Sequence, residues 1–255
     1  VNYFTRARSN KSTHILEVID SKQVFGTRIG FGRLRILEQV TGYQKKQVAT
    51  QKSLGIVPLD LPVIEFETQG LWIEIPDSIR ENIESCQLHF MGGIHALEHA
   101  AIGIMPLLVM TDRNDLGGIS IPFHPQVEKA VVFVYDGAPG GLGLTRQAFS
   151  NAGRLLERTL ETIADCPCDT GCPACVHSPK CGSGNRPIDK FSARTLLEMM
   201  LEKNERVSVP DSDLPVYKHI GQKYEPIDTE TGIDNPAADT VRQPVRRYGV
   251  LDIET

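Results

Sequence analysis

The sequence predicts an α+β fold in which an N-terminal antiparallel β sheet or small barrel is followed by a helix-rich, zinc-binding region. Three observations predict it. Strand-like runs fill the first 76 residues, helical apolar periodicity dominates the next part, and five cysteines crowd between residues 166 and 181. With 255 residues, 40% of them apolar, the chain can form one large domain or two small ones.

A basic, β-rich subdomain is expected over residues 1–76, where strand-like runs separated by Gly and Pro include 15–19, 34–40 and 71–75. Residues 1–52 carry ten Lys and Arg against three acidic residues, whereas the rest of the chain has a net charge of −12. Such asymmetry favours phosphate contact, although a solvated strand face can look the same. The candidate nucleic-acid-binding residues interleave with Phe31 and Tyr43; they are Arg28, Arg33, Arg35, Lys45 and Lys46.

A helical and β zinc-binding accessory domain is expected over residues 77–203. Ser78 is a candidate N-cap for its first helix. A second helix should begin at about Gly93, and Pro106 should kink or end it.

The middle of this domain should form a strand, a turn and a helix. A buried strand is expected at 130–136, a glycine-rich turn at 137–143, and a helical apolar stripe at 148–163. A last amphipathic helix is expected at 193–201, after the cysteines.

The C-terminal part is polar and proline-spaced, which favours a linker or loosely packed tail over residues 204–246. Residues 247–255 resemble the first strand of a truncated domain. Asp252 and Glu254 would lie on one side of that strand and could share Mg²⁺ or Mn²⁺ for phosphodiester cleavage. Further ligands would lie beyond residue 255, so no nuclease activity is expected. Because the sequence begins without Met, we expect a fragment of a longer protein.

The cysteine cluster predicts a metal site, because tight loops strain disulfides and the N-terminus lacks the layout of a signal peptide. We therefore expect a reducing, cytoplasmic location. The candidate ligands are Cys166, Cys168, Cys172, Cys175 and Cys181. Thiolates two residues apart wrap one tetrahedral zinc ion, and a closed four-thiolate site is structural.

Five thiols compete for four positions. Cys172 and Cys175 form the clearest pair and Cys168 is a third ligand, which leaves Cys166 and Cys181 to compete for the last position. A redox dithiol, an iron–sulfur cluster, or His177 in place of one thiol remain alternatives. The sixth cysteine, Cys86, is expected to be a small apolar packing residue.

Two further motifs could form a catalytic or ligand-binding site. His95, Glu98 and His99 have the H-x-x-E-H order of a zinc metallopeptidase, but an alanine-rich core helix explains them as well. The glycine-rich turn could cradle phosphate, but it lacks the Gly-Lys-Ser/Thr ending of an ATP-binding loop. A packing role for its glycines, or contact with a neighbouring domain, is the preferred interpretation.

Taken together, these residues resemble the C-terminal region of mitomycin repair factor A-type, RecQ-like helicases of superfamily 2. The cysteine cluster, continuing to Lys190, and the glycine turn are the specific part of the match. Shorter matches are 30–32 with 40–43, 59–62 and 93–100. The region covered is about residues 1–200.

The resemblance implies an accessory region of an ATP-dependent 3′–5′ DNA helicase acting in DNA repair. It would bind structural Zn²⁺, help to bind or guide DNA, and brace the motor domains of the same parent chain, without catalysis of its own. ATP and Mg²⁺ would bind only in those motor domains. The implied partner is single-stranded or forked DNA, and no contact with a membrane is implied.

The resemblance assigns a definite role only to the cysteines, as zinc ligands, and places His95 and His99 in a helix without a proteolytic role. Residues 250–255 are similar to the first motif of DnaQ-like 3′–5′ exonucleases, which suggests a helicase–exonuclease fusion. A zinc metallopeptidase and a protein-interaction zinc module remain the alternatives from other functional classes.

Overall fold

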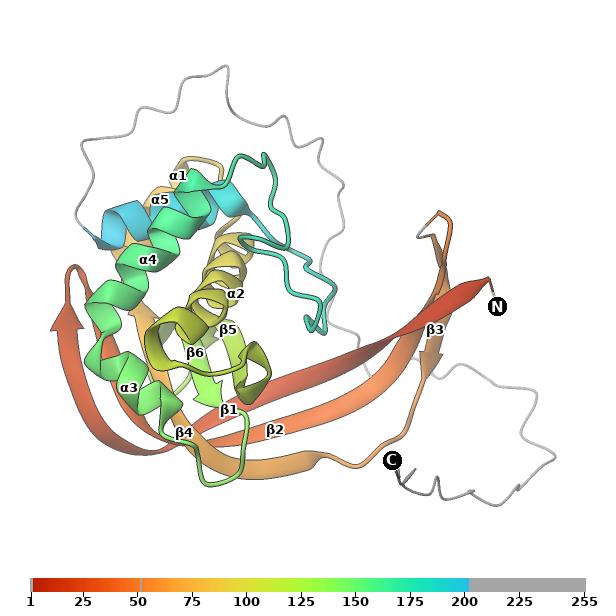
Figure 1. Ribbon diagram of the computed structural model, residues 1–255, viewed down its shortest axis with the longest axis horizontal. Helices are drawn as coiled ribbons and strands as arrows, with labels where there is room; N and C mark the ends of the chain where they lie inside the picture. Colours follow the sequence, from red (N-terminus) through yellow and green to blue (C-terminus); the bar gives the residue numbers. More distant parts are fainter. Residues whose placement is uncertain (1, 51, 202–255) are drawn as a thin grey trace, which may run out of the picture. The chain divides into compact units, whose positions relative to one another are not determined.

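The computed structural model describes residues 2–50 and 52–201 of the chain. Within them the predicted α+β class is confirmed (Figure 1). The elements are β1 (Tyr3–Val24), β2 (Thr27–Gln47), β3 (Ser53–Pro58), β4 (Ile64–Ile75), α1 (Asp77–Ser85), α2 (Phe90–Val109), the 3₁₀ turn η1 (Arg113–Asp115), β5 (Leu116–His124), β6 (Lys129–Asp136), α3 (Leu144–Ser150), α4 (Ala152–Asp165) and α5 (Lys190–Met200). The predictions for 204–246 and 247–255 lie outside the described residues.

The strands form one antiparallel sheet in the order β1-β2-β4-β6-β5, with β3 paired to the far part of β2. Side chains alternate across its two faces. Ile73 and Val132 join the apolar core under the helices, whereas Trp72 and Phe133 join a second cluster on the opposite face. Both faces are buried, which is why β6 reads as a continuous apolar run.

The sheet curls until β1 approaches the turn between β5 and β6, which gives a nearly closed barrel. The Gln126 side chain both donates to and accepts from the Ile15 backbone, at 2.8 Å each way. Nearby, His124 Nε2 lies 3.0 Å from the Thr13 carbonyl oxygen. The second apolar cluster fills the interior: Leu34, Ile36, Trp72, Ile119, Val131, Phe133 and Tyr135. The sheet thus includes strands from both sides of residue 76, and a subdomain division there stays a prediction.

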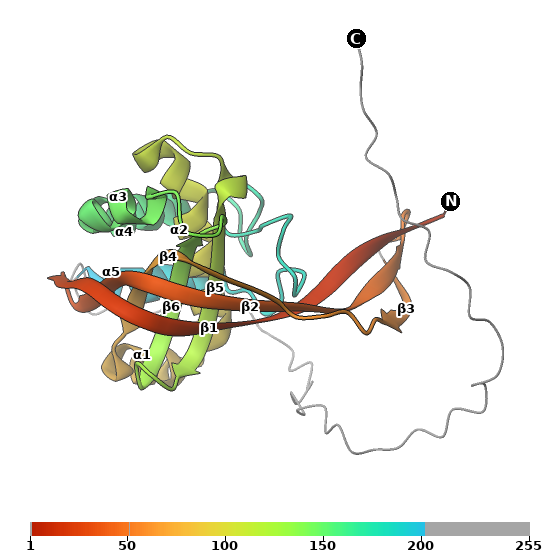
Figure 2. The same cartoon turned by 90° about the horizontal axis from the view of Figure 1, so that it is seen from below.

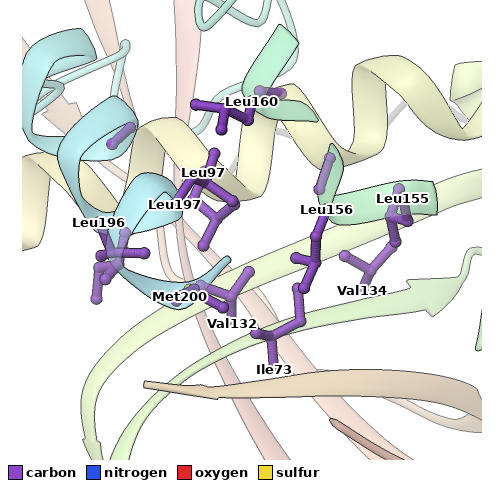
Figure 3. Packing of buried hydrophobic residues seen from close by; sticks show 14 of the residues in the cluster. Ile73, Leu97, Val132, Val134, Leu155, Leu156, Leu160, Leu196, Leu197 and Met200 are labelled. Atoms are coloured by element: carbon purple, nitrogen blue, oxygen red, sulfur yellow. The ribbon is translucent and has the colours of Figure 1, made fainter. Parts of the chain in front are cut away.

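Helix α2 is the centre of the helical layer (Figure 1). By length and composition it would pass for a membrane span, but 67% of its most apolar window is buried inside the protein, as in a soluble core helix. It packs on β5, β6, α4 and α5. Figure 3 shows Leu97 of α2 among leucines of α4 and α5, above Ile73 and Val132 of the sheet.

Several predicted boundaries are wrong. Helix α1 begins at Asp77 without a side-chain cap, so Ser78 does not cap it. Helix α2 begins at Phe90, because the His89 ring accepts the Gly92 N–H at 2.9 Å. Pro106 does not end it: the helix continues to Val109, three residues later, so little of the hydrogen-bond ladder is lost. The kink that was the other expectation at Pro106 stays a prediction.

Two further differences concern the second half of the chain. The predicted stripe at 148–163 is two helices, α3 and α4, that meet at Asn151. Strand β5 was not predicted, because two glycines and a proline interrupt its apolar pattern. Cys86 is half-buried against the main core, in line with the packing role expected of it.

Strand β2 continues past its last pair with β4, Glu38 with Ile64, and there pairs only with β1 and β3. These three segments form what we call the arm: residues 3–8, 40–47 and 53–58. Figures 1 and 2 show it extending from the barrel, away from the helices. Midway along its β1 segment, Arg6 donates to the Cys181 carbonyl oxygen at 3.1 Å.

Candidate metal centre

Four of the five clustered cysteines lie together in the segment that follows α4. Cys166 ends that helix, and the backbone N–H groups of Cys175, Val176 and His177 all donate to the Cys172 carbonyl oxygen. This turn aims the thiols inward. The Sγ atoms of Cys166 and Cys168, of Cys166 and Cys172, and of Cys168 and Cys175 are each 3.5 Å apart. Those of Cys172 and Cys175 are 3.8 Å apart.

These spacings fit a tetrahedral zinc ion. With Zn–S bonds of about 2.3 Å, the sulfurs of a four-thiolate site lie about 3.8 Å from one another. A disulfide would bring two sulfurs to about 2 Å, and all six cysteines are free. The donor set therefore suits one closed, structural Zn²⁺ without a water ligand.

The thiols of the cluster differ in acidity. Burial, the largest influence, raises the pKa of Cys175 to about 12. Hydrogen bonds from the Cys168 backbone and from neighbouring thiols lower the pKa of Cys166 to about 7. A divalent cation that replaces the thiol protons would remove the cost of ionising the buried sulfur.

A cation on α5 supports the cluster from outside. Lys190 Nζ donates to the carbonyl oxygens of Cys166 at 2.6 Å and Cys168 at 2.5 Å, and lies 3.5 Å from Cys168 Sγ. The positive charge of Lys190 partly neutralises the net negative charge of a zinc–tetrathiolate centre. No local sequence pattern marks Lys190 as a partner of the cluster, so its role was not predicted.

Cys181 does not lie with the other four cysteines. Its Sγ lies 3.4 Å from Nε2 of His95, and His99 completes a compact group of three potential ligands. Burial opposes ionisation of Cys181, but hydrogen bonds from His95 and His99 lower its pKa to about 4. In the competition for the fourth position, the geometry therefore places Cys166, and not Cys181, with the three others. His177 belongs to neither group in the described part of the chain.

The peptidase motif is only partly assembled. His95 and His99 share one face of α2, with ring centroids 4.4 Å apart. Glu98, by contrast, is buried against β5, where it bonds to Ser120, and burial raises its pKa. The general base of a metallopeptidase must reach the metal-bound water that attacks the substrate, and this carboxyl faces the interior.

The glycine-rich turn is occupied by a carboxylate of the protein itself. Asp136, fully buried at the end of β6, accepts N–H bonds from Leu142, Gly143 and Leu144 on Oδ2 at 2.6, 2.7 and 3.3 Å. Its Oδ1 accepts the Thr145 N–H at 2.9 Å. These are the N–H groups that a phosphate cradle would use, and Asp136 already occupies them. The geometry therefore agrees with a packing role for the turn and not with anion binding.

The candidate nucleic-acid residues divide into two groups. Arg33 pairs with Glu67 at 2.7 Å, and Arg35 pairs with Glu65 at 3.1 Å and with Glu67 at 3.0 Å. Arg28 lies 3.8 Å from a Glu74 oxygen.

The remaining two candidates are on the arm. Lys45 lies over the rings of Tyr3 and Tyr43, at 5.5 and 6.0 Å from their centroids. Lys46 is its neighbour on β2. The structure thus separates three arginines paired with glutamates from Lys45, which lies beside two aromatic rings, and its neighbour Lys46.

A curled antiparallel barrel, a helical layer and a four-thiol cluster define an α+β zinc-binding domain. The model of the MrfA Zn-binding domain matches residues 97–176. That range contains the glycine turn and the four-cysteine cluster but not Cys181 or His95.

Similar proteins include the uncharacterized protein MJ1572.1 of Methanocaldococcus jannaschii, 41% identical over 111 residues, which cover 99% of that protein and 42% of this chain. The ATP-dependent helicase YprA of Bacillus subtilis is 29% identical over 177 residues, 69% of this chain and 23% of the helicase. The ATP-dependent helicase hrq1 of Schizosaccharomyces pombe is 29% identical over 191 residues, 69% of this chain and 18% of the helicase.

A crystal structure of the DUF1998 helicase MrfA bound to DNA has a TM-score of 0.53 and 26% identity, over 78% of this chain and 26% of that one. The chain belongs to the family of proteins that carry the MrfA Zn-binding domain. It spans about a quarter or less of the helicases that it matches.

Proposed function

We propose that this chain is a structural-zinc accessory region of an ATP-dependent 3′–5′ DNA helicase that acts in cytoplasmic DNA repair. The observation that carries the proposal is the four-thiol cluster on a fold shared with MrfA. The region contributes DNA binding and braces the motor domains of the same parent chain, where ATP and Mg²⁺ bind. It has no catalysis of its own.

In this proposal Cys166, Cys168, Cys172 and Cys175 hold one Zn²⁺. Cys175 and the next residue, Val176, are buried in the main core, and Lys190 connects the cluster to α5. The ion therefore fastens a segment without regular structure to two helices. Its binding free energy becomes folding free energy for that segment.

The test of the zinc centre is the metal content of the purified chain, measured by plasma mass spectrometry. Replacing both Cys172 and Cys175 by Ser should remove one zinc ion per chain. Cys86→Ser is the matched control, because Cys86 lies away from the cluster, and it should keep the full content. Retention of all zinc in the double variant, or a content of iron, would contradict the assignment.

DNA binding is proposed for the arm. Lys45 and Lys46 are cationic, and Tyr3 and Tyr43 offer rings beside Lys45 on which bases can stack. Arg28, Arg33 and Arg35, by contrast, have glutamate partners whose charge opposes phosphate contact. The two lysines should therefore carry more of the DNA affinity than the three arginines.

The test is fluorescence anisotropy with single-stranded and forked DNA over a range of salt concentrations. Exchanging Lys45 and Lys46 for Glu should weaken binding of all sequences and reduce the salt slope by about one per lysine. The matched control, Arg33→Gln with Arg35→Gln, should change affinity less. An equal or larger loss in the control would move the DNA face to β2 and β4.

A protein-interaction zinc module is the second candidate, because the arm also exposes apolar side chains: Leu54 and Ile56 are each 53% exposed. Under that alternative the chain would show no salt-sensitive DNA affinity. The exonuclease fusion, carried by Asp252 and Glu254 alone, stays a prediction. The sequence of the parent gene downstream of residue 255 would test it.

A further inference from the structure

Three metal-ligating side chains outside the four-cysteine cluster converge on one point. His95 and His99 come from one face of α2, and Cys181 comes from the segment after the cluster, 176–187, which we call the Cys181 loop. Their ligand atoms all lie within 4.8 Å of one another. His99 and Cys181 are buried, at 5% and 9% exposure.

Both imidazole rings are already oriented as in metal sites. Nδ1 of His95 lies 2.6 Å from the Pro187 carbonyl oxygen, and Nδ1 of His99 lies 2.8 Å from that of Val176. A carbonyl oxygen can only accept, so each Nδ1 carries the proton and donates it. In the neutral form of each ring, which is the form that binds metal, the opposite nitrogen, Nε2, keeps its lone pair. This backbone support is the usual outer shell of a metal-bound histidine.

The Cys181 sulfur also has hydrogen-bond partners that suit a metal ligand. Cys181 Sγ accepts the Asn185 N–H at 3.2 Å and lies 3.1 Å from the Ser183 hydroxyl. Bonds of this kind stabilise a metal-bound thiolate. The 3.4 Å between Cys181 Sγ and His95 Nε2 is close to the roughly 3.5 Å expected for sulfur and nitrogen on one tetrahedral zinc, with bonds of about 2.3 and 2.0 Å.

We propose that His95, His99 and Cys181 bind a second zinc ion, separate from the four-cysteine centre. One thiolate and two neutral imidazoles are a donor set that Zn²⁺ favours, and a water molecule completes the tetrahedron on the half-buried side of His95. The ion holds the Cys181 loop to α2. It also explains the fifth thiol, which the four-cysteine centre does not need.

The alternative is a metal-free thiol hydrogen-bonded to two histidines. Metal content after dialysis against a metal-free buffer distinguishes the two. The wild-type chain should contain about two zinc ions, Cys181→Ser should contain about one, and Cys86→Ser should again contain two. A wild type with one zinc ion, retained in Cys181→Ser and lost when Cys172 and Cys175 are both Ser, would overturn the second site.

That last result would leave the proposed helicase-accessory function intact. Conversely, one zinc ion that is lost only in Cys181→Ser would support this site and overturn the four-cysteine centre. The outcomes for the two centres are therefore separable. His95→Gln provides an independent variant with the cysteines unchanged, and it should also contain about one zinc ion.

X-ray absorption at the zinc edge tests the same site without any substitution. Two ions should give an average of about 2.5 sulfur and 1.5 nitrogen or oxygen ligands per zinc, with outer-shell scattering from imidazole carbons. A pure sulfur shell of about four atoms, without imidazole scattering, would overturn the proposal.

Discussion

Replacing Asp136 by Ala should destabilise the protein strongly, because one buried carboxylate satisfies four backbone N–H groups at the start of α3. A hydrogen bond to a charged acceptor contributes about 1.5–3 kcal/mol. The Thr145 N–H is fully buried and would lose its acceptor outright, whereas the turn at Leu142, 54% exposed, can admit water. If the bond to the Thr145 N–H counts in full and the other three count in part, the free energy of unfolding should fall by about 3–4 kcal/mol.

The assay is urea unfolding of the zinc-loaded chain, followed by circular dichroism. Asp20→Ala is the control, because Asp20 is exposed and its carboxylate accepts only the adjacent Ser21 N–H among the bonds recorded for the described chain. It should cost less than about 0.5 kcal/mol. A loss below about 1 kcal/mol in Asp136→Ala would refute the reasoning. Sulfate should partly restore Asp136→Ala, since the vacated N–H groups then form an anion site at a helix start.

Three further substitutions test the packing around the metal centre. Gly93→Ala should cost about 1–3 kcal/mol in urea unfolding, since its methyl group would lie 2.9 Å from Ser192 Cβ on α5. Gly103→Ala on the same helix should be neutral or stabilising, because its methyl group would meet only the Arg113 guanidinium, at an ordinary contact distance of 3.6 Å. Lys190→Met should weaken zinc affinity about 10-fold or more in chelator competition, and Lys180→Met should leave it unchanged. Asp189→Ala should cost about 1–2 kcal/mol in thermal unfolding, because its buried carboxylate caps α5 by accepting the Ser192 N–H.

The sequence predicted the fold class well because the strongest periodic signals lie in the core. Residues 130–136 are buried on both faces, so their apolar run is continuous and easily recognised. Strand β5 was not predicted from the sequence, because its pairing with β6 overrides the weak strand preference of its glycines. The nearly closed barrel depends on Gln126 reaching Ile15, a contact across 111 residues that no local pattern encodes.

The candidate site was predictable where the spacing was short. Cys172 and Cys175 follow from one turn of chain, whereas the approach of Cys181 to α2 spans 86 residues and needed the structure. The histidines were recognised from the sequence as a motif, but with Glu98 as their partner instead of Cys181. Arg33 and Arg35 show what a count of positive charge leaves out, because it does not reveal the glutamates that pair with them from the adjacent strand; their contact with nucleic acid stays a prediction.

The contact between Arg6 and the Cys181 loop has a thermodynamic consequence for the arm. A two-stranded ribbon alone would sample many orientations, but β3 pairs with β2, and the Cys181 loop holds β1 through Arg6. The arm therefore loses its orientational freedom during folding, before it meets any ligand. A ligand that contacts Lys45 meets a preorganised surface, so more of the contact energy appears as affinity.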